Sequence, residues 1–251
     1  MNILLTNDDG YFSRGIKSIY SEFSIENSVT VIAPATEQSG VGHGFTYKQP
    51  LYFEDVDFMN AKALAVLGTP ADCVKYGLGH LNDLEIDVVV SGINAGNNAG
   101  IAGFYSGTVA AAREAAFWKV PAIAFSLCEG GEEFFDEYAK ISKHIFEKIF
   151  MDIENIDSRV FYNVNFPNCS PSESRGVKIT RQSMAFYKDS YTVKKDDEDR
   201  EQLWLHGIVT DLEDSNHYDM PAVYDDYITI TPLNFDQTDS EEIKNLKDLQ
   251  I

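Results

Sequence analysis

Basic residues are scarce in this sequence. Its 251 residues include 20 Lys and Arg against 40 Asp and Glu, which gives a formal net charge of -20. A surface this acidic repels polyphosphate backbones, so we do not expect a protein that coats DNA or RNA. One small anion could still bind beside a local positive element, such as a metal ion or a helix N-terminus.

Cysteine and long apolar runs are scarce too. The three cysteines, Cys73, Cys128 and Cys169, are far apart and form no C-x-x-C pair, which argues against a disulfide scaffold or a zinc site. No segment approaches the roughly 18 apolar residues of a membrane span. The first residues lack the positive region and the longer apolar core of a secretory signal. We therefore expect a cytoplasmic protein with free thiols and no membrane attachment.

The first two-thirds of the chain alternates between strand and helix patterns. Short apolar runs predict strands at 2–6, 29–33, 63–67, 87–91 and 122–126. Helical spacing of apolar residues predicts helices at 13–24, 106–118 and 132–150. After Thr69, a plausible N-cap, Pro70 and Asp72 suit the first turn of another helix. This succession predicts an α/β fold with a doubly wound, mostly parallel, Rossmann-like sheet.

Residues 160–232 have a different pattern. Short β-rich pieces at 160–165, 177–180 and 227–231 are separated by polar stretches, and we interpret them as sheet extensions and hairpins. The charged run at 194–201 is predicted to be a solvated loop, and the residues after Leu233 a loosely held or helical tail. We expect a single domain over 1–251, with an α/β core at 1–160 and a β-rich extension at 161–251.

Polar loops follow three of the predicted strands, at 7–10, 34–44 and 92–98. Ligands of open α/β sheets lie outside the carboxyl ends of the strands, so these loops are expected to form one site. Their carboxylate, hydroxyl and amide oxygens favour magnesium, manganese or calcium over zinc. Adjacent strand residues point to opposite faces, so Asp8 and Asp9 can share a cation only if the backbone turns, which Gly10 permits.

Each of these loops could also be an ordinary polar or flexible turn. The glycines of 40–44 form neither a P-loop nor a Rossmann fingerprint. For the lone His43, a structural or solvent-facing role is more common than substrate contact. The segment Ser106-Gly107-Thr108 opens an Ala-rich helix, where first-turn N–H groups can hold a phosphate. An N-cap without a ligand is the alternative there.

Taken in order, four segments resemble the SurE (survival protein E) nucleotidases. They are MNILLTNDDG, EQSGVGH, VVSGINAGNN and YSGTVAAAREA, and the resemblance continues through LGTPADCV, NVNFP, KITR and YITITPL. It covers the chain from Asn2 to about Leu233, and the four-part signature with these spacings is highly specific. The sequence departs from a common version at Glu37-Gln38, where many members carry a basic residue, and residues 182–220 match only loosely.

The resemblance implies a metal-dependent phosphomonoesterase that hydrolyses nucleoside 5'- and 3'-monophosphates to nucleoside and phosphate, sometimes with activity on short polyphosphate. It implies one divalent cation, Mg2+ or Mn2+, with Ca2+ possible in crystals. The implied metal ligands are Asp8, Asp9, Ser39 and Asn94, the first two also being catalytic. The implied substrate-binding residues are Asn94, Asn97, Ser106, Gly107 and Thr108. Water is the expected nucleophile, because Asp8-Asp9 lacks the D-x-D spacing of phosphatases that form an aspartyl-phosphate.

Two other classes of protein share part of this pattern. A response-regulator receiver also has paired acidic residues after its first strand and would use Asp55 or Asp57 as phosphoacceptor, but it is about half as long. A non-catalytic, metal-dependent nucleotide sensor would keep the same pocket without turnover. The presence of all four ligand positions favours the enzyme.

The extension is rich in aromatic residues. Seven of them are Phe186, Tyr187, Tyr191, Trp204, Tyr218, Tyr224 and Tyr227. They could pack in the core, but isolated hairpins are marginal and exposed strands pair with other chains. The resemblance adds that SurE proteins form dimers or tetramers and exchange C-terminal segments. We therefore expect a homodimer or homotetramer, with parts of residues 182–240 reaching a partner subunit.

Overall fold

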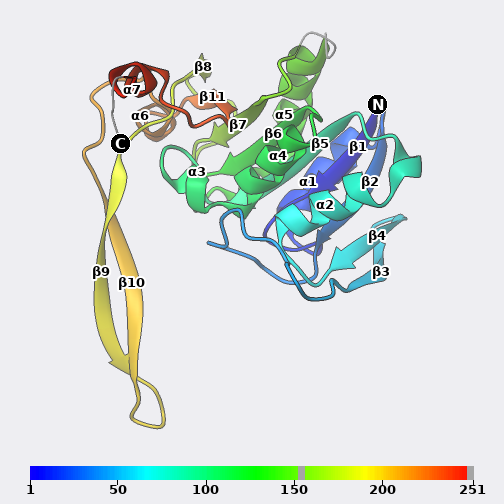
Figure 1. Ribbon diagram of the computed structural model, residues 1–251, viewed down its shortest axis with the longest axis horizontal. Coiled ribbons are helices and arrows are strands. Elements are labelled where there is room, and N and C mark those ends of the chain that lie inside the picture. Colours follow the sequence, from blue (N-terminus) through cyan, green and yellow to red (C-terminus); the bar gives the residue numbers. More distant parts are fainter. Residues whose placement is uncertain (152–155, 248–251) are drawn as a thin grey trace.

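A nine-stranded sheet organises the chain in a computed structural model that describes residues 1–151 and 156–247 (Figure 1). Its strands, in spatial order, are β3 (Phe53–Phe58), β4 (Ala61–Val66), β2 (Ser28–Pro34), β1 (Asn2–Thr6), β5 (Val88–Ala95), β6 (Ala122–Leu127), β7 (Val160–Phe166), β11 (Ile228–Asn234) and β8 (Val177–Ile179). All neighbours from β4 to β7 are parallel, and β3 and β11 join antiparallel. The predicted doubly wound, mostly parallel sheet is confirmed.

Helices cover both faces of this sheet. On one face α1 (Arg14–Phe23) packs against α5 (Phe135–Ile149), and on the other α2 (Pro70–Gly79) packs against α4 (Gly107–Phe117). In β1, Ile3 and Leu5 enter the first of these cores while Leu4 enters the second. Strands buried on both faces need apolar residues at every position, which explains the continuous runs in the sequence.

Helix α2 begins as its sequence predicts. The Thr69 side chain accepts a hydrogen bond from Asp72 N at 3.2 Å, and Asp72 Oδ2 accepts one from Thr69 N at 2.9 Å. This reciprocal capping box, with Pro70 in the first turn, satisfies backbone donors that would otherwise lack partners. Two 3-10 turns, η1 (Asn82–Leu84) and η2 (Glu132–Phe134), and the short α3 (Ala102–Tyr105) complete this half of the chain.

The prediction of a solvated loop at 194–201 is wrong at both of its ends. Strands β9 (Phe186–Lys195) and β10 (Glu201–Thr210) form a separate antiparallel hairpin, and only the turn between them is a loop. This hairpin projects from the body, with nearly every residue exposed (Figure 1). Neither face is buried, so the sequence carries no clean alternation of apolar and polar residues that would mark these strands.

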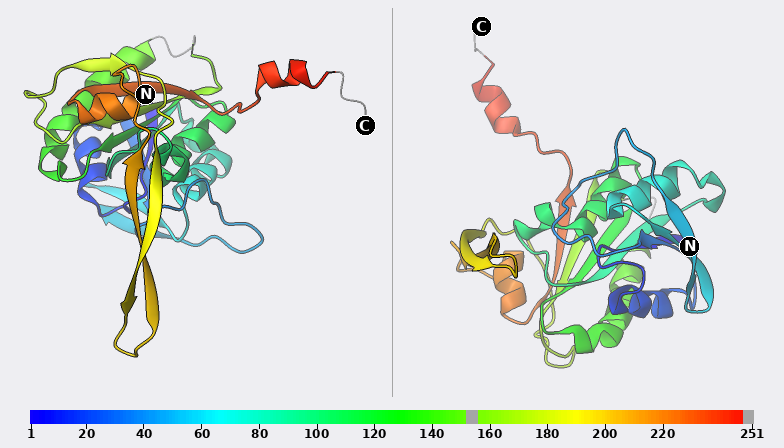
Figure 2. Two further views of the ribbon diagram at one scale, coloured as in Figure 1. Left: turned by 90° about the vertical axis from the view of Figure 1, so that its left-hand side faces the viewer. Right: turned by 90° about the horizontal axis from the view of Figure 1, so that it is seen from below.

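Three further elements complete the described chain: the edge strand β3 and two short helices near its C-terminal end. The exposed edge strand β3 carries Glu54, Asp55 and Asp57, and its charge concealed it in the sequence. Helix α6 (Asp219–Tyr224) packs on β11, and α7 (Ser240–Asn245) is an exposed helix in the tail, as predicted. Figure 2 shows the hairpin and α7 leaving the body in different directions. The division of the chain at residue 160 stays a prediction.

Among the helices of the described residues, none has both the length and the apolar composition to cross a membrane.

Candidate metal and phosphate site

Three loops meet at the carboxyl end of the sheet, beside β1. This is where the strand order reverses, the usual position of ligands in open α/β sheets. Gln38 N donates to Asp8 O at 2.7 Å, which joins the loop after β2 to the loop after β1. Ala95 N donates to Asp9 Oδ2 at 3.2 Å, which adds the end of β5. Gly42 N donates to Tyr105 O at 2.9 Å, which brings the start of α4 to the same place.

Asp8 contacts the start of α4, where the sequence predicts a phosphate site. It is buried, and its Oδ1 and Oδ2 accept hydrogen bonds from the Thr108 hydroxyl at 2.5 Å and the Thr108 N–H at 3.2 Å. The positive end of α4 therefore stabilises the negative charge of this carboxylate. Burial nevertheless raises the pKa of Asp8 above its usual range, against the lowering effect of those hydrogen bonds.

Gly107 makes room for Asp8. A Cβ atom added at Gly107 would lie 2.9 Å from Asp8 Cβ and 3.0 Å from Pro70 Cγ. The sequence suggested that this glycine lets an anion approach the backbone. In the structure the space beside it is filled by the aspartate and by the first turn of α2.

Asp9 is less buried than Asp8 and is held by the Ala95 N–H. Burial, next the charge of Asp8 and least the charge of Glu37 raise the pKa of Asp9 to about 7, against the lowering effect of the hydrogen bond from Ala95 N. Closely spaced carboxylates of this kind are stabilised when a cation lies between them. The pair therefore fits a bound cation.

Ser39 and Asn94 are arranged to offer oxygen atoms. The Ser39 hydroxyl donates to Glu37 Oε1 at 2.6 Å, which leaves its oxygen lone pairs free for another partner. Asn94 Nδ2 donates to Gly96 O at 2.7 Å, so the amide oxygen is not used in that bond. Together with Asp8 and Asp9 this is a set of hard oxygen donors, as Mg2+, Mn2+ and Ca2+ prefer.

Histidine and cysteine do not contribute to this set. Within residues 1–151 and 156–247, no group of three or more His, Cys, Asp or Glu side chains is placed to hold a metal ion. All three cysteines are free. Two carboxylates, one hydroxyl and one amide are thus what the chain offers at this point.

The remaining predicted substrate residues divide into two groups. Ser106, the N-cap of α4, accepts from Val109 N at 3.1 Å and stays beside Gly107 and Thr108. Asn97 lines a cavity of about 490 Å3 together with Glu129 and Tyr224. Its contact with substrate stays a prediction.

Two asparagines of β7 hold the loop that carries Asn94. Asn98 N donates to Asn165 Oδ1 at 2.7 Å, and Asn98 O accepts from Asn163 Nδ2 at 2.9 Å. The next turn is fixed by the buried Asp219, which accepts from Gly100 N at 3.0 Å. Sequence reasoning did not find these positioning residues. The polar residues inside the otherwise apolar segment NVNFP were the available signal.

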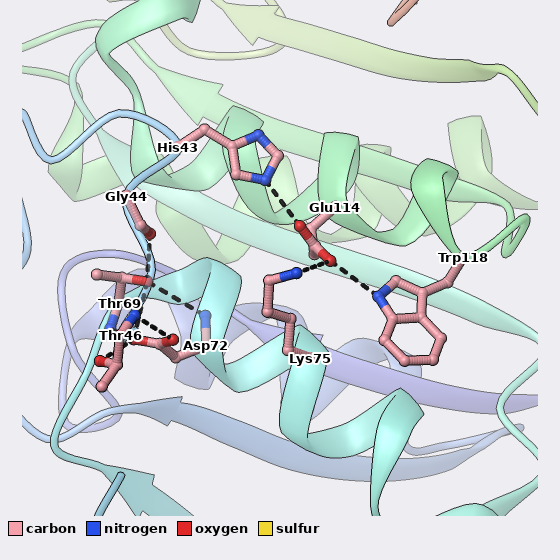
Figure 3. Close-up of polar contacts among 8 residues, drawn as sticks. All are labelled: His43, Gly44, Thr46, Thr69, Asp72, Lys75, Glu114 and Trp118. Atoms are coloured by element: carbon pink, nitrogen blue, oxygen red, sulfur yellow. Dashed lines mark hydrogen bonds and ion pairs between the residues drawn. The ribbon is translucent and has the colours of Figure 1, made fainter. Parts of the chain in front are cut away.

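A buried carboxylate, Glu114, connects α4 to α2 and to residues 40–44, which we call the Gly-rich loop (Figure 3). It accepts hydrogen bonds from Lys75 Nζ and Trp118 Nε1, both at 2.8 Å, and contacts His43 Nε2 at 2.9 Å. The His43 ring also stacks on Phe117, with centroids 5.2 Å apart. His43 therefore has the structural role that its isolation in the sequence favoured, and Glu114 is the partner that the sequence did not reveal.

Comparisons with known proteins identify the family of this chain. A family profile described as "Survival protein SurE" matches residues 3–189. The chain is 39% identical to a "5'-nucleotidase SurE" of Petrotoga mobilis, covering 98% of both chains, and 37% identical to one of Alkaliphilus metalliredigens, covering 100% of this chain and 99% of that one. The crystal structure of a SurE protein from Aquifex aeolicus matches with a TM-score of 0.83 and 35% identity, covering 98% of each chain. This chain belongs to the SurE family.

Proposed function

We propose that this protein is a nucleotidase that hydrolyses nucleoside 5'-monophosphates, and also 3'-monophosphates, to nucleoside and phosphate. The observation that carries the proposal is that the loop of Asp8 and Asp9 is hydrogen-bonded to Gln38, next to Ser39, and to Ala95, next to Asn94, at the switch point of the sheet. The relatives named 5'-nucleotidase, which align over nearly the whole chain, support it.

One divalent cation, Mg2+ or Mn2+, is part of this proposal. Its ligands would be Asp8, Asp9, the Ser39 hydroxyl and the Asn94 amide oxygen. A cation there supplies charge neutralisation and Lewis acidity at the phosphate group. Ca2+ has the same preference for oxygen ligands and could bind at this site in crystals.

The chain's own residues orient the phosphate ester. In this proposal the Ser106 hydroxyl holds a phosphate oxygen, and its position as the N-cap of α4, at the positive end of the helix, supports that role. Both oxygens of Asp8 are engaged by Thr108, which makes Asp8 a holding group and a poor nucleophile. Water therefore attacks phosphorus, the bond from phosphorus to the ester oxygen breaks, and the nucleoside leaves with a proton.

Assembly and location belong to the same proposal. We assign a homodimer or homotetramer in which segments of residues 182–240 contact a partner, and a cytoplasmic location. The projecting β9–β10 hairpin supports the first (Figure 2). The three free cysteines agree with the second.

Phosphate release from a panel of nucleoside monophosphates tests the activity. The protein is first treated with a chelator, and single metals are then added back. We expect no release after chelation and recovery with Mg2+ or Mn2+. Binding of nucleotides without any phosphate release under all metals would contradict the proposal and favour a sensor.

A further inference from the structure

A third carboxylate, Glu37, lies beside the acidic pair of the candidate metal site. Its Oε1 accepts a hydrogen bond from the Ser39 hydroxyl at 2.6 Å, so its side chain turns toward a candidate ligand. Its charge also acts on Asp9, because it contributes to the raised pKa of that group. A hydrogen bond and a charge effect therefore both place the Glu37 carboxylate close to the candidate ligands.

The three carboxylates differ in their exposure to solvent. Asp8 has only 4% of its surface exposed, Asp9 is partly buried, and Glu37 is exposed. They form a series that leads from the start of α4, where Thr108 contacts Asp8, to the outer rim of the site. Glu37 is therefore the charge closest to any part of a substrate that extends from the bound phosphate toward solvent.

The charge balance of the site leaves Glu37 uncompensated. One divalent cation balances the two aspartates, and the N-terminus of α4 directs its partial positive charge at Asp8. The groups that shift the pKa of Asp8 and Asp9 include no Lys, Arg or His from the described part of the chain. Glu37 thus adds a negative charge that neither the cation nor the helix neutralises.

A negative charge at the rim distinguishes phosphate compounds by their own charge. A phosphate monoester carries about two negative charges, all on the group that the cation holds. In a diphosphate, a second negative phosphate follows this group and extends toward the rim, where Glu37 repels it. We propose that Glu37 is a specificity-determining residue that disfavours nucleoside diphosphates and longer phosphate chains relative to monophosphates; this rests on the proposed function.

The experiment compares adenosine 5'-monophosphate with adenosine 5'-diphosphate. The readout is the preference for the monophosphate, given by the ratio of the two kcat/KM values. Glu37→Gln removes the charge but keeps an oxygen that can accept from Ser39, and it should lower this preference about fivefold. Glu37→Lys changes the charge by twice as much and should lower the preference about 25-fold. Metal binding by the diphosphate is the same in every assay, so it cancels between variants.

Two controls separate the charge from other effects of the substitution. Glu147→Gln removes the same charge from the last turn of α5, at the opposite edge of the sheet, and should leave the preference unchanged. In about 0.5 M sodium chloride, the difference between wild type and Glu37→Gln should become smaller, because the Debye length falls to about 4 Å. Circular dichroism verifies that each variant is folded.

Three results would overturn the inference. They are a wild-type ratio near one, ratios in Glu37→Gln and Glu37→Lys equal to that of wild type, and no hydrolysis of the diphosphate by Glu37→Lys. If the wild type hydrolyses neither nucleotide, the proposed function fails by itself, and calorimetry with Mn2+ then compares binding of phosphate and pyrophosphate. A larger gain in affinity of Glu37→Gln for pyrophosphate than for phosphate would support the inference, and equal affinity changes would refute it.

Discussion

At the scale of single residues, the two adjacent aspartates have different surroundings. Asp8 accepts two hydrogen bonds from Thr108, whereas Asp9 accepts one from Ala95 N and is close to the charges of Asp8 and Glu37. An asparagine at position 8 must turn its NH2 group toward one of the Thr108 donors. An asparagine at position 9 removes one of the three neighbouring negative charges, which are those of Asp8, Asp9 and Glu37.

Asp8→Asn and Asp9→Asn should therefore differ in stability while both lose activity. Each should lower phosphate release by about 100-fold or more, because each removes charge that holds the cation and the transition state. Without added metal, Asp8→Asn should lose about 1–2 kcal/mol of unfolding free energy, and Asp9→Asn should lose none. Urea unfolding and a phosphate-release assay measure the two effects. A folded variant with activity within a few-fold of wild type would contradict the metal assignment.

Gly107 offers a second test at this scale. Gly107→Ala places a Cβ atom against Asp8 and Pro70, so we expect it to weaken Mn2+ binding and phosphate release together. Titration calorimetry with Mn2+ measures the first effect. Gly44→Ala, in the same Gly-rich region but with only ordinary or slightly tight contacts of 3.3 Å or more, is the control. Unchanged Mn2+ affinity in a folded Gly107→Ala protein would show that Asp8 does not need the space that Gly107 leaves.

At the scale of elements, α4 is joined to α2 and to the Gly-rich loop through one carboxylate. Glu114 is only 2% exposed, whereas Lys75 is 36% exposed, so solvent weakens that ion pair. Burial raises the pKa of Glu114, but hydrogen bonds from His43, Lys75 and Trp118 outweigh it, and the net effect is a pKa below the ordinary value. The charged form is therefore favoured in the folded chain.

Glu114→Gln should lower the unfolding free energy by about 2 kcal/mol at pH 7, because it leaves buried donors imperfectly paired. A lowered folded pKa stabilises the fold above the ordinary value of 4.5, and this contribution is lost as the pH falls through the folded pKa. In urea titrations below about pH 4.5, the difference in unfolding free energy between wild type and Glu114→Gln should become smaller.

Glu147→Gln, on the exposed side of α5, is the control and should change the unfolding free energy by less than about 0.5 kcal/mol. A constant difference across pH would argue against a role for the Glu114 charge.

At the scale of the whole molecule, our assembly proposal depends on the exposed apolar side chains of the β9–β10 hairpin. Four large apolar side chains of β10 are more than half exposed: Leu203, Trp204, Leu205 and Ile208. Exposed apolar strands of this kind pair with other chains. These exposed side chains support the contact with a partner subunit that we propose for residues 182–240.

Shortening the hairpin tests the assembly. Replacing residues 191–205 by Asn-Gly joins Ser190 to His206, which already face each other across the hairpin, through a favoured two-residue turn. Sedimentation at micromolar protein should show a smaller assembly for this variant than for wild type.

A companion truncation after Asp236 removes α7 but keeps Phe235, which packs on Phe117. An unchanged assembly in both variants would place the interface elsewhere. A fully active wild-type monomer of 28.1 kDa would refute the oligomer.

The sequence by itself determined the parallel core and the positions of Asp8, Asp9, Ser39 and Asn94 at or after the carboxyl ends of strands of that core. Continuous apolar runs occur where strands are buried on both faces, and the carboxyl ends of parallel strands lie at one edge. Only the tertiary structure decided which groups serve those residues. Thr108, Glu114 and Asp219 act on partners about 36 to 119 positions away, such as Ser183 and Gly100, and local spacing carries no record of such contacts. The hairpin escaped prediction because a strand with both faces in solvent has no periodic apolar pattern.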